Sequence, residues 1–267
     1  MNIGDETYQL STKQVEDFQK DGHILIESLS LQQEMVFFQP IIKAACSQLN
    51  TETRKLQDRD TYSKAFLQIM NLWTQNEKVK KFVFAKRFAD VAARLLGVDK
   101  VRLYHDQALF KEPNGGYTPW HQDQYYWPLD TNKTITMWMP LVDISEDMGM
   151  LTFASGSHKL GEVKSEAISD DTEAIFEAHI KKHGFTLQCA KVMKAGDATF
   201  HSGWTIHGAG PNKSRDQMRE VMTVIYYADG AKIQSPGNKH QKTDLDKWLG
   251  NKSVGQFADS SSNPILN

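Results

Sequence analysis

Apolar and polar positions follow two different patterns along the chain, and the change falls near residue 100. Before it, apolar residues recur at steps of three and four, which predicts amphipathic helices. After it, short runs rich in Val, Ile, Thr, Tyr, Phe and Trp are separated by Gly, Asn, Asp and Pro, which predicts strands joined by turns. The chain therefore divides into a helical first part and a β-rich second part.

Three main helices are expected in the first part. They cover residues 11–20, residues 31–49 and residues 75–96. Pro40 lies inside the second helix and should kink it or divide it in two. The third helix has a broad apolar face made of two neighbouring stripes, and Gly97 follows as its stop signal.

Six strands are expected in the second part: Val101–Lys111, Thr134–Ile144, Met150–Ala154, Thr186–Met193, Ala198–His201 and Glu220–Ala228. A helical insert over Asp171–Lys182 separates two of them, and the polar tail from Gln234 is either a wrapped arm or partly disordered. Many short strands after a block of helices are typical of a jelly roll or barrel that helices buttress. We therefore expect a mainly β fold with helices, in the α+β class.

The bulk composition suits a single domain over residues 1–267. We expect residues 1–98 to be mostly helical support, residues 99–230 to form the jelly-roll core and residues 231–267 to form a C-terminal arm. A net charge of −2 gives no electrostatic basis for binding nucleic acid or an anionic membrane. The sequence thus predicts no nucleic-acid or membrane partner, and no protein partner is evident from it.

The location is expected to be cytoplasmic. Cys46 and Cys189 are the only cysteines, and they indicate neither a disulfide framework nor a cysteine metal site. The N-terminus lacks the basic and then apolar pattern of a signal peptide, and no apolar run approaches the length of a membrane span.

The strongest chemical signal is the run Trp120-His121-Gln122-Asp123. A His and an Asp two residues apart project from the same side of an extended strand. His207 lies far downstream and can add a third ligand, which would complete the facial triad of two His and one carboxylate that non-haem Fe(II) enzymes use. Arg219 follows twelve residues later and is the cation that a dicarboxylate co-substrate would need at its far end.

The remaining histidines are expected to have other roles. His179 and His183 lie four residues apart on a helix, a spacing that can bind zinc, but no third ligand is evident and a solvated face is the simpler interpretation. His105 is expected to form hydrogen bonds. His201 lies six residues before His207 and is a candidate to support a metal ligand from behind.

A set of short motifs keeps one order between residues 100 and 228: Gln107–Lys111, Trp120–Asp123, Trp138–Asp143, Gly149–Leu151, Ser155–Lys159, His207–Ser214 and Arg219. As a set they resemble the phytanoyl-CoA dioxygenase family. Members of that family are double-stranded β-helix oxygenases, with a jelly-roll or cupin-like core, that use Fe(II), 2-oxoglutarate and O2.

The resemblance implies a role for each motif residue. The iron ligands would be His121, Asp123 and His207. Arg219 would hold the distal carboxylate of 2-oxoglutarate, and Gln107 and Trp138 would line its pocket. The implied activity is hydroxylation of an unactivated C–H bond of a small molecule, with release of succinate and CO2. Asp123 favours hydroxylation or desaturation over halogenation, because halogenating relatives have a small residue there.

Two other classes of function stay open on the sequence alone. One is a metal-dependent cupin-type enzyme that does not use 2-oxoglutarate, and the other is a non-catalytic jelly-roll binding protein. Arg219 distinguishes the first, since such an enzyme does not need a cation there. A binding protein would tolerate the loss of any member of the triad, yet all three residues are present.

Overall fold

The computed structural model describes residues 7–163 and 168–267. Its core is a pair of antiparallel sheets. The larger sheet has six strands in the order β1 (His23–Ile26), β10 (Ala198–Ser202), β5 (Thr134–Pro140), β12 (Val221–Ala228), β3 (Val101–Phe110) and β2 (Leu67–Met70). The smaller sheet has four strands in the order β4 (Thr118–His121), β11 (His207–Ala209), β7 (Leu151–Ala154) and β8 (Leu187–Cys189). A separate ribbon pairs β6 (Ile144–Ser145) with β9 (Val192–Met193).

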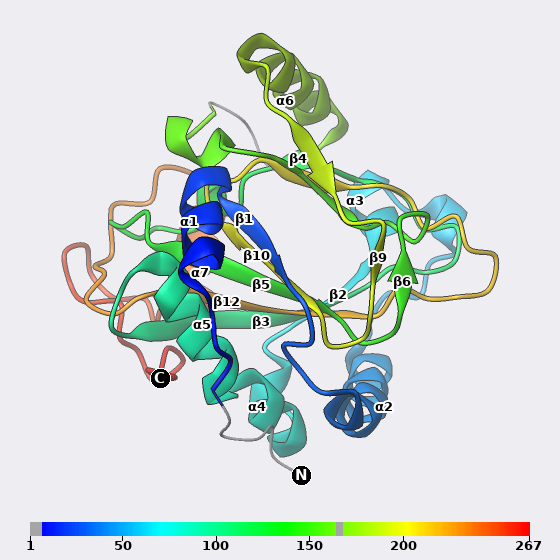
Figure 1. Ribbon diagram of the computed structural model, residues 1–267, viewed down its shortest axis with the longest axis horizontal. Helices are drawn as coiled ribbons and strands as arrows, with labels where there is room; N and C mark the ends of the chain where they lie inside the picture. The colour runs from blue at the N-terminus through cyan, green and yellow to red at the C-terminus, as the bar shows by residue number, and fades with distance from the viewer. Residues whose placement is uncertain (1–6, 164–167) are drawn as a thin grey trace.

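Helices surround the sheets. Those before β3 are α1 (Thr12–Asp21), α2 (Gln32–Leu49), α3 (Thr61–Ala65), α4 (Glu77–Val83) and α5 (Lys86–Leu96), and those after it are α6 (Asp170–His183) and α7 (Lys239–Trp248). Short 3-10 turns are η1 (Leu56–Asp58), η2 (Leu72–Thr74), η3 (Asp123–Tyr126) and η4 (Ser157–Leu160). Helices α2, α4 and α5 lie on the outer side of the six-stranded sheet, whereas α6 lies beside β4 (Figure 1).

The two faces of strand β5 have different surroundings. All seven of its residues are buried, as in a strand that is covered on both faces. Ile135, Met137 and Met139 belong to the main hydrophobic cluster that the helices share. Thr136 and Trp138 line a cavity between the two sheets. These facing antiparallel sheets with outer helices make an α+β fold with a jelly-roll core, as the sequence predicts.

The C-terminal arm wraps back onto the core. The Leu103 N–H donates to the carbonyl of Pro264 over 3.0 Å, and the Leu266 N–H donates to the carbonyl of Val101 over 3.1 Å. In the structure the tail lies against the core as an arm, and it contains the helix α7, which was not predicted. No helix in the described part of the chain has the length and apolar character that crossing a membrane requires.

The single helix expected at residues 75–96 is wrong, because the chain forms two helices there. Helix α4 ends at Val83, and Ala85 has extended backbone angles (φ −61°, ψ 113°) at the start of α5. Helix α4 packs against α2, whereas α5 packs against the six-stranded sheet. The broad apolar face therefore belongs to two helices with different neighbours, a division that periodicity alone does not reveal.

Pro40 does not divide α2, which runs through it without a break. Its neighbours Met35, Phe38 and Ile42 are buried in the main hydrophobic cluster. Packing of this apolar face stabilises the helix, although proline cannot donate its backbone hydrogen bond.

Two expected strands are shorter than predicted. The strand over residues 134–144 ends at Pro140, and the one over residues 186–193 is interrupted after Cys189. In both cases the chain leaves its sheet and then forms a short strand of the β6–β9 ribbon. Each apolar run therefore contains two strands that belong to different sheets. Strands β1 and β2 were not predicted, because four residues are too few for an alternation to stand out.

Candidate active site

The three candidate ligands come from neighbouring elements of the smaller sheet. His121 is the last residue of β4, His207 is the first residue of β11, and the two are direct partners across this antiparallel pair. The sequence predicted that Asp123 lies on the same strand as His121. In the structure, Asp123 instead begins the turn η3. Gln122 between them stays extended (φ −126°, ψ 125°), so His121 and Asp123 still face the same side.

Their side chains converge on one point. The Oδ1 atom of Asp123 lies 3.7 Å from the Nε2 atom of His121 and 3.7 Å from the Nε2 atom of His207. The three ligand atoms lie within 4.8 Å of one another, which fits a single metal ion. No other group of three such residues occurs in the described part of the chain, and His179 and His183 gain no third ligand there.

Backbone carbonyls orient both imidazoles. The Nδ1 atom of His121 donates to the Pro119 carbonyl over 2.8 Å, and the Nδ1 atom of His207 donates to the Thr205 carbonyl over 2.9 Å. These bonds place the proton on Nδ1 and leave the Nε2 lone pair for a metal. Burial lowers the pKa of both histidines below the usual value, so the rings are neutral, as ligands must be.

Asp123 is held on its other oxygen. Its Oδ2 atom accepts hydrogen bonds from the Thr136 hydroxyl over 2.7 Å and from the Nε2 atom of His201 over 3.1 Å. Burial opposes the ionised form, but the hydrogen bond from His201 helps to lower the pKa of Asp123 below its usual range. The carboxylate is therefore ionised, with Oδ1 free to bind a cation.

Arg219 supplies a buried cation to the site. It is 2% exposed, and no carboxylate in the described residues forms an ion pair with it. Its guanidinium donates to the carbonyls of Gly149 over 2.5 Å and Leu109 over 3.4 Å, while its Nε atom has no partner in that part of the chain. Burial lowers its pKa. A buried cation without a counter-ion is costly, so this position favours an anionic ligand.

One cavity joins the triad and Arg219. Its volume is about 240 Å³, and both Gln107 and Trp138 line it, as the family resemblance implies. The Trp138 ring lies 5.4 Å from the Arg219 guanidinium carbon. Gln107 accepts a hydrogen bond from Gln68 over 2.6 Å, which fixes its amide at the wall. All six candidate site residues thus border the same space.

The family of the chain follows from comparison with known proteins. The family model described as phytanoyl-CoA dioxygenase matches residues 18–221, a stretch that includes the triad and Arg219. The chain belongs to the phytanoyl-CoA dioxygenase family. The probable alpha-ketoglutarate-dependent hypophosphite dioxygenase of Stutzerimonas stutzeri is a similar curated protein, 26% identical over 166 residues. The match covers 61% of this chain and 57% of that relative's length.

Solved structures share the fold of this phytanoyl-CoA dioxygenase family member. The alpha ketoglutarate dependent carbocyclase SnoK from nogalamycin biosynthesis superposes with a TM-score of 0.78, at 22% identity and 97% coverage of each chain. The epimerase SnoN, in complex with Fe3+, alpha ketoglutarate and nogalamycin RO, gives 0.76 at 19% identity, covering 96% of this chain and 98% of its own. EctD from S. alaskensis, with 2-oxoglutarate and 5-hydroxyectoine, gives 0.69 at 20% identity, with 85% and 79% coverage.

Sequence reasoning missed several residues that the fold of this family member brings to the cavity. Thr136 was seen only as part of a strand, although its register opposite His201 places its hydroxyl against Asp123. His201 does support a ligand, as the sequence suggested. Asp244 on α7 lines the cavity although it lies in the tail, and no local signal separates it from its polar neighbours.

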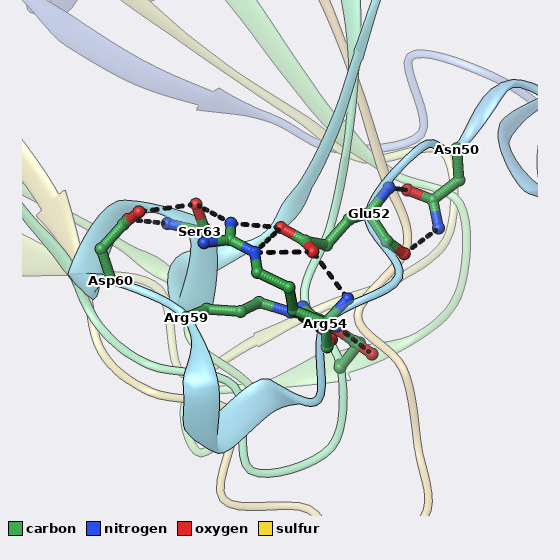
Figure 2. Close-up of polar contacts among 7 residues, drawn as sticks. Asn50, Glu52, Arg54, Arg59, Asp60 and Ser63 are labelled. Atoms are coloured by element: carbon green, nitrogen blue, oxygen red, sulfur yellow. Dashed lines mark hydrogen bonds and ion pairs between the residues drawn. The ribbon is translucent and has the colours of Figure 1, made fainter.

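Helix α3 contributes to the cavity wall, and the loop between α2 and α3 leads into it. Tyr62 on α3 lines the cavity, and a network of polar contacts holds the loop before it (Figure 2). Asp60 caps α3 by accepting from the Ser63 N–H over 2.8 Å. Arg54 donates to Glu52 over 3.0 Å and to the Ser63 hydroxyl over 3.2 Å. These contacts fix the loop that precedes α3.

Proposed function

We propose that this protein is an Fe(II)- and 2-oxoglutarate-dependent oxygenase that hydroxylates a C–H bond of a small molecule. The observation that supports this most strongly is the joint presence, in one cavity, of a metal-competent triad and a buried guanidinium that forms no ion pair with any described residue. A cupin-type metal enzyme without a keto-acid co-substrate has no use for Arg219 at this position. A binding protein has no use for a neutral, oriented imidazole pair.

The triad and Arg219 would have separate roles. His121, Asp123 and His207 would hold the iron on one face and leave its other positions open. Arg219 would pair with the distal carboxylate of 2-oxoglutarate and so fix its orientation. Bound iron and 2-oxoglutarate supply the oxidising chemistry, in which the keto acid loses CO2 and becomes succinate while O2 oxidises the substrate.

Asp123 supports hydroxylation as the outcome. Its carboxylate fills the position that a small residue leaves open in halogenating relatives. Gln107 and Trp138 would shape the space between the metal and Arg219, in which the co-substrate lies. Trp138 also covers the guanidinium, which limits the access of water to the ion pair.

A small substrate agrees with the volume of the cavity. About 240 Å³ lies below the ~300–1,000 Å³ that is typical of ligand pockets, and 2-oxoglutarate would occupy part of it. Small molecules are also named with the structural neighbours SnoN and EctD. We place the enzyme in the cytoplasm, where a reducing environment keeps iron ferrous and its two unpaired cysteines reduced.

Substrate-independent turnover tests the proposal. Many oxygenases of this type decarboxylate 2-oxoglutarate slowly without substrate, so succinate can be measured directly in the presence of Fe(II), 2-oxoglutarate and O2. We expect succinate from the wild type and none above background from Asp123→Ala or His207→Ala. Succinate formation that needs no iron, or that survives either substitution, would contradict the proposal.

A further inference from the structure

The cavity has a second end, away from Arg219. On β3 the cavity-lining residues alternate as Leu109, Gln107 and His105. Arg219 contacts the carbonyl of Leu109, so His105 lies about 13 Å further along the strand, at ~3.3 Å per residue. His105 on β3 and Thr136 on β5 are both paired with Ile225 on β12, the strand between them, so the two lie at the same level of the sheet. Thr136 is the residue that holds Asp123. This second end therefore begins beside the triad.

Asp244 brings a carboxylate to this second end. It lies on α7, and η3 holds that helix in place: the Gln241 amide donates to the Tyr125 carbonyl over 3.0 Å, and the Asn238 amide donates to the same oxygen over 3.2 Å. Because η3 begins at Asp123, the helix is fixed relative to the triad. Asp244 lines the cavity, and Tyr62 lies close enough to interact electrostatically with the carboxylates of both Asp244 and Asp123.

The carboxylate of Asp244 has hydrogen-bond donors but no counter-ion among the residues that the structure describes. It accepts from the Tyr104 hydroxyl over 2.8 Å and from the Trp248 side chain. Lys247 acts on it electrostatically, but no cation in residues 7–163 and 168–267 lies within the 4.0 Å of an ion pair. Arg219, at the far end, is the single lysine or arginine among the described residues that line the cavity.

A second unsatisfied group lies at the same end. His105 is 2% exposed, and its Nδ1 atom has no hydrogen-bond partner in the described part of the chain. Aromatic side chains complete this region, from Tyr62, Tyr126 and Trp127. A carboxylate, a neutral imidazole and aromatic rings are the combination that recognises a protonated amine.

We propose that this end of the cavity binds a protonated amine of the primary substrate, with Asp244 as its counter-ion. The inference rests on the proposed function, because the triad and 2-oxoglutarate would occupy the other end. An amine held by Asp244 would place the attached carbon chain beside the metal position. An anionic substrate, such as that named for the hypophosphite dioxygenase relative, would be repelled by the same carboxylate.

Matched ligands test this directly. Wild-type protein loaded with Fe(II) and 2-oxoglutarate under argon is titrated by calorimetry with 2-phenylethylamine, 2-phenylethanol and 3-phenylpropionate, then with n-butylamine and n-butanol, and finally with hypophosphite. We expect at least one amine to bind about tenfold or more tightly than its alcohol, with the carboxylate and hypophosphite weaker still. If neither amine binds better than its alcohol, the proposal is wrong.

Substitution then assigns the preference to one residue. In Asp244→Asn we expect the favoured amine to lose about tenfold or more in affinity, while its alcohol changes little. Asp246→Asn removes the same charge from an exposed position two residues on and should bind the amine as the wild type does. An amine preference that survives Asp244→Asn would also overturn the proposal.

Two checks keep the outcomes separate. The visible band of the Fe(II)–2-oxoglutarate chelate should form in wild type and in Asp244→Asn alike, because Asp244 touches neither group. Absence of the band in the wild type would count against the proposed function, whereas its presence without amine selectivity counts against Asp244 alone. The wild-type comparison of amine with alcohol needs no variant, so a poorly folding Asp244→Asn would not prevent the test.

Discussion

His201 donates a hydrogen bond from its Nε2 atom to the Oδ2 atom of Asp123 over 3.1 Å. This contact leaves the other carboxylate oxygen facing the two histidines of the triad. His201 comes from the six-stranded sheet and Asp123 follows a strand of the smaller sheet, so the bond ties the two layers together at the metal position. The fold thus sets the orientation of the carboxylate through these contacts.

Thr136 provides the second support and the cleaner test of it. Thr136→Val removes the 2.7 Å hydrogen bond to Asp123 at nearly constant volume, and we expect Fe(II) affinity to fall by about 10–100-fold. Thr199→Val is the matched control, since the Thr199 hydroxyl is buried in the same sheet without a partner among the described residues. Equal Fe(II) affinity of the two variants in a metal titration would contradict this role.

Arg219 should determine affinity for the co-substrate. Arg219→Met removes the charged partner of the distal carboxylate, so we expect the KM for 2-oxoglutarate to rise by about 10–100-fold in the succinate assay. Fe(II) affinity without 2-oxoglutarate should stay within about twofold, because Arg219 does not contact the triad residues. Arg215→Met, at an exposed position, serves as the control. An unchanged KM in Arg219→Met would mean that another group holds the carboxylate.

Binding of an amine should depend on pH through Asp244. Burial raises the pKa of Asp244 to about 7, and the ionised form is the one that attracts an amine. An alkylamine stays protonated in this range, so affinity should rise as pH increases from 6 to 8, roughly as the ionised fraction of Asp244 does. Groups near Asp244 that can modulate this profile are Tyr104, His105, Tyr62, Asp123, Tyr126, Trp248 and Lys247. Calorimetry at several pH values should give a flat profile for Asp244→Asn; a flat wild-type profile would contradict the assignment.

A buried ion pair links two of the supporting helices. Arg87 on α5 and Glu34 on α2 lie 2.9 Å apart, with side chains 5% and 4% exposed. Removing one partner leaves the other charge buried, so Arg87→Met should reduce the free energy of unfolding by about 3–5 kcal/mol. Lys86→Met breaks the exposed pair with Asp90 next to it and should cost about 0–1 kcal/mol. Urea denaturation measures both, and equal losses would contradict the account.

The central parts of the site could be predicted from sequence because their chemistry is local. Histidine, aspartate and arginine at these spacings in a β-rich context indicate a metal site with an anion-binding cation. The order of the surrounding motifs then indicated the family. The long strands Val101–Phe110 and Val221–Ala228 were also visible, since each combines β-branched and aromatic residues over eight or more positions. Residues 18–221, which the family model matches, contain all six predicted site residues.

Features that depend on tertiary packing could not be predicted. The break at Ala85 arises because α4 packs against α2 whereas α5 packs against the six-stranded sheet. The local sequence around Ala85 contains no information about either packing partner. Asp244 lies in a polar tail with weak periodicity, and long-range contacts bring it to the cavity: the bonds from α7 to the Tyr125 carbonyl, the bond from Tyr104 and the packing of Leu245. The contact of Thr136 with Asp123 requires strand register, which a single strand does not specify.

The most direct test of the central claim is an anaerobic titration of the protein with Fe(II) and then 2-oxoglutarate, followed in the visible region. The account predicts a weak charge-transfer band that saturates at one Fe(II) and one 2-oxoglutarate per chain. It also predicts that His207→Ala loses the band and that Arg219→Met needs more 2-oxoglutarate to reach it. A wild-type protein that binds neither Fe(II) nor 2-oxoglutarate, or a band that persists in His207→Ala, would contradict the account.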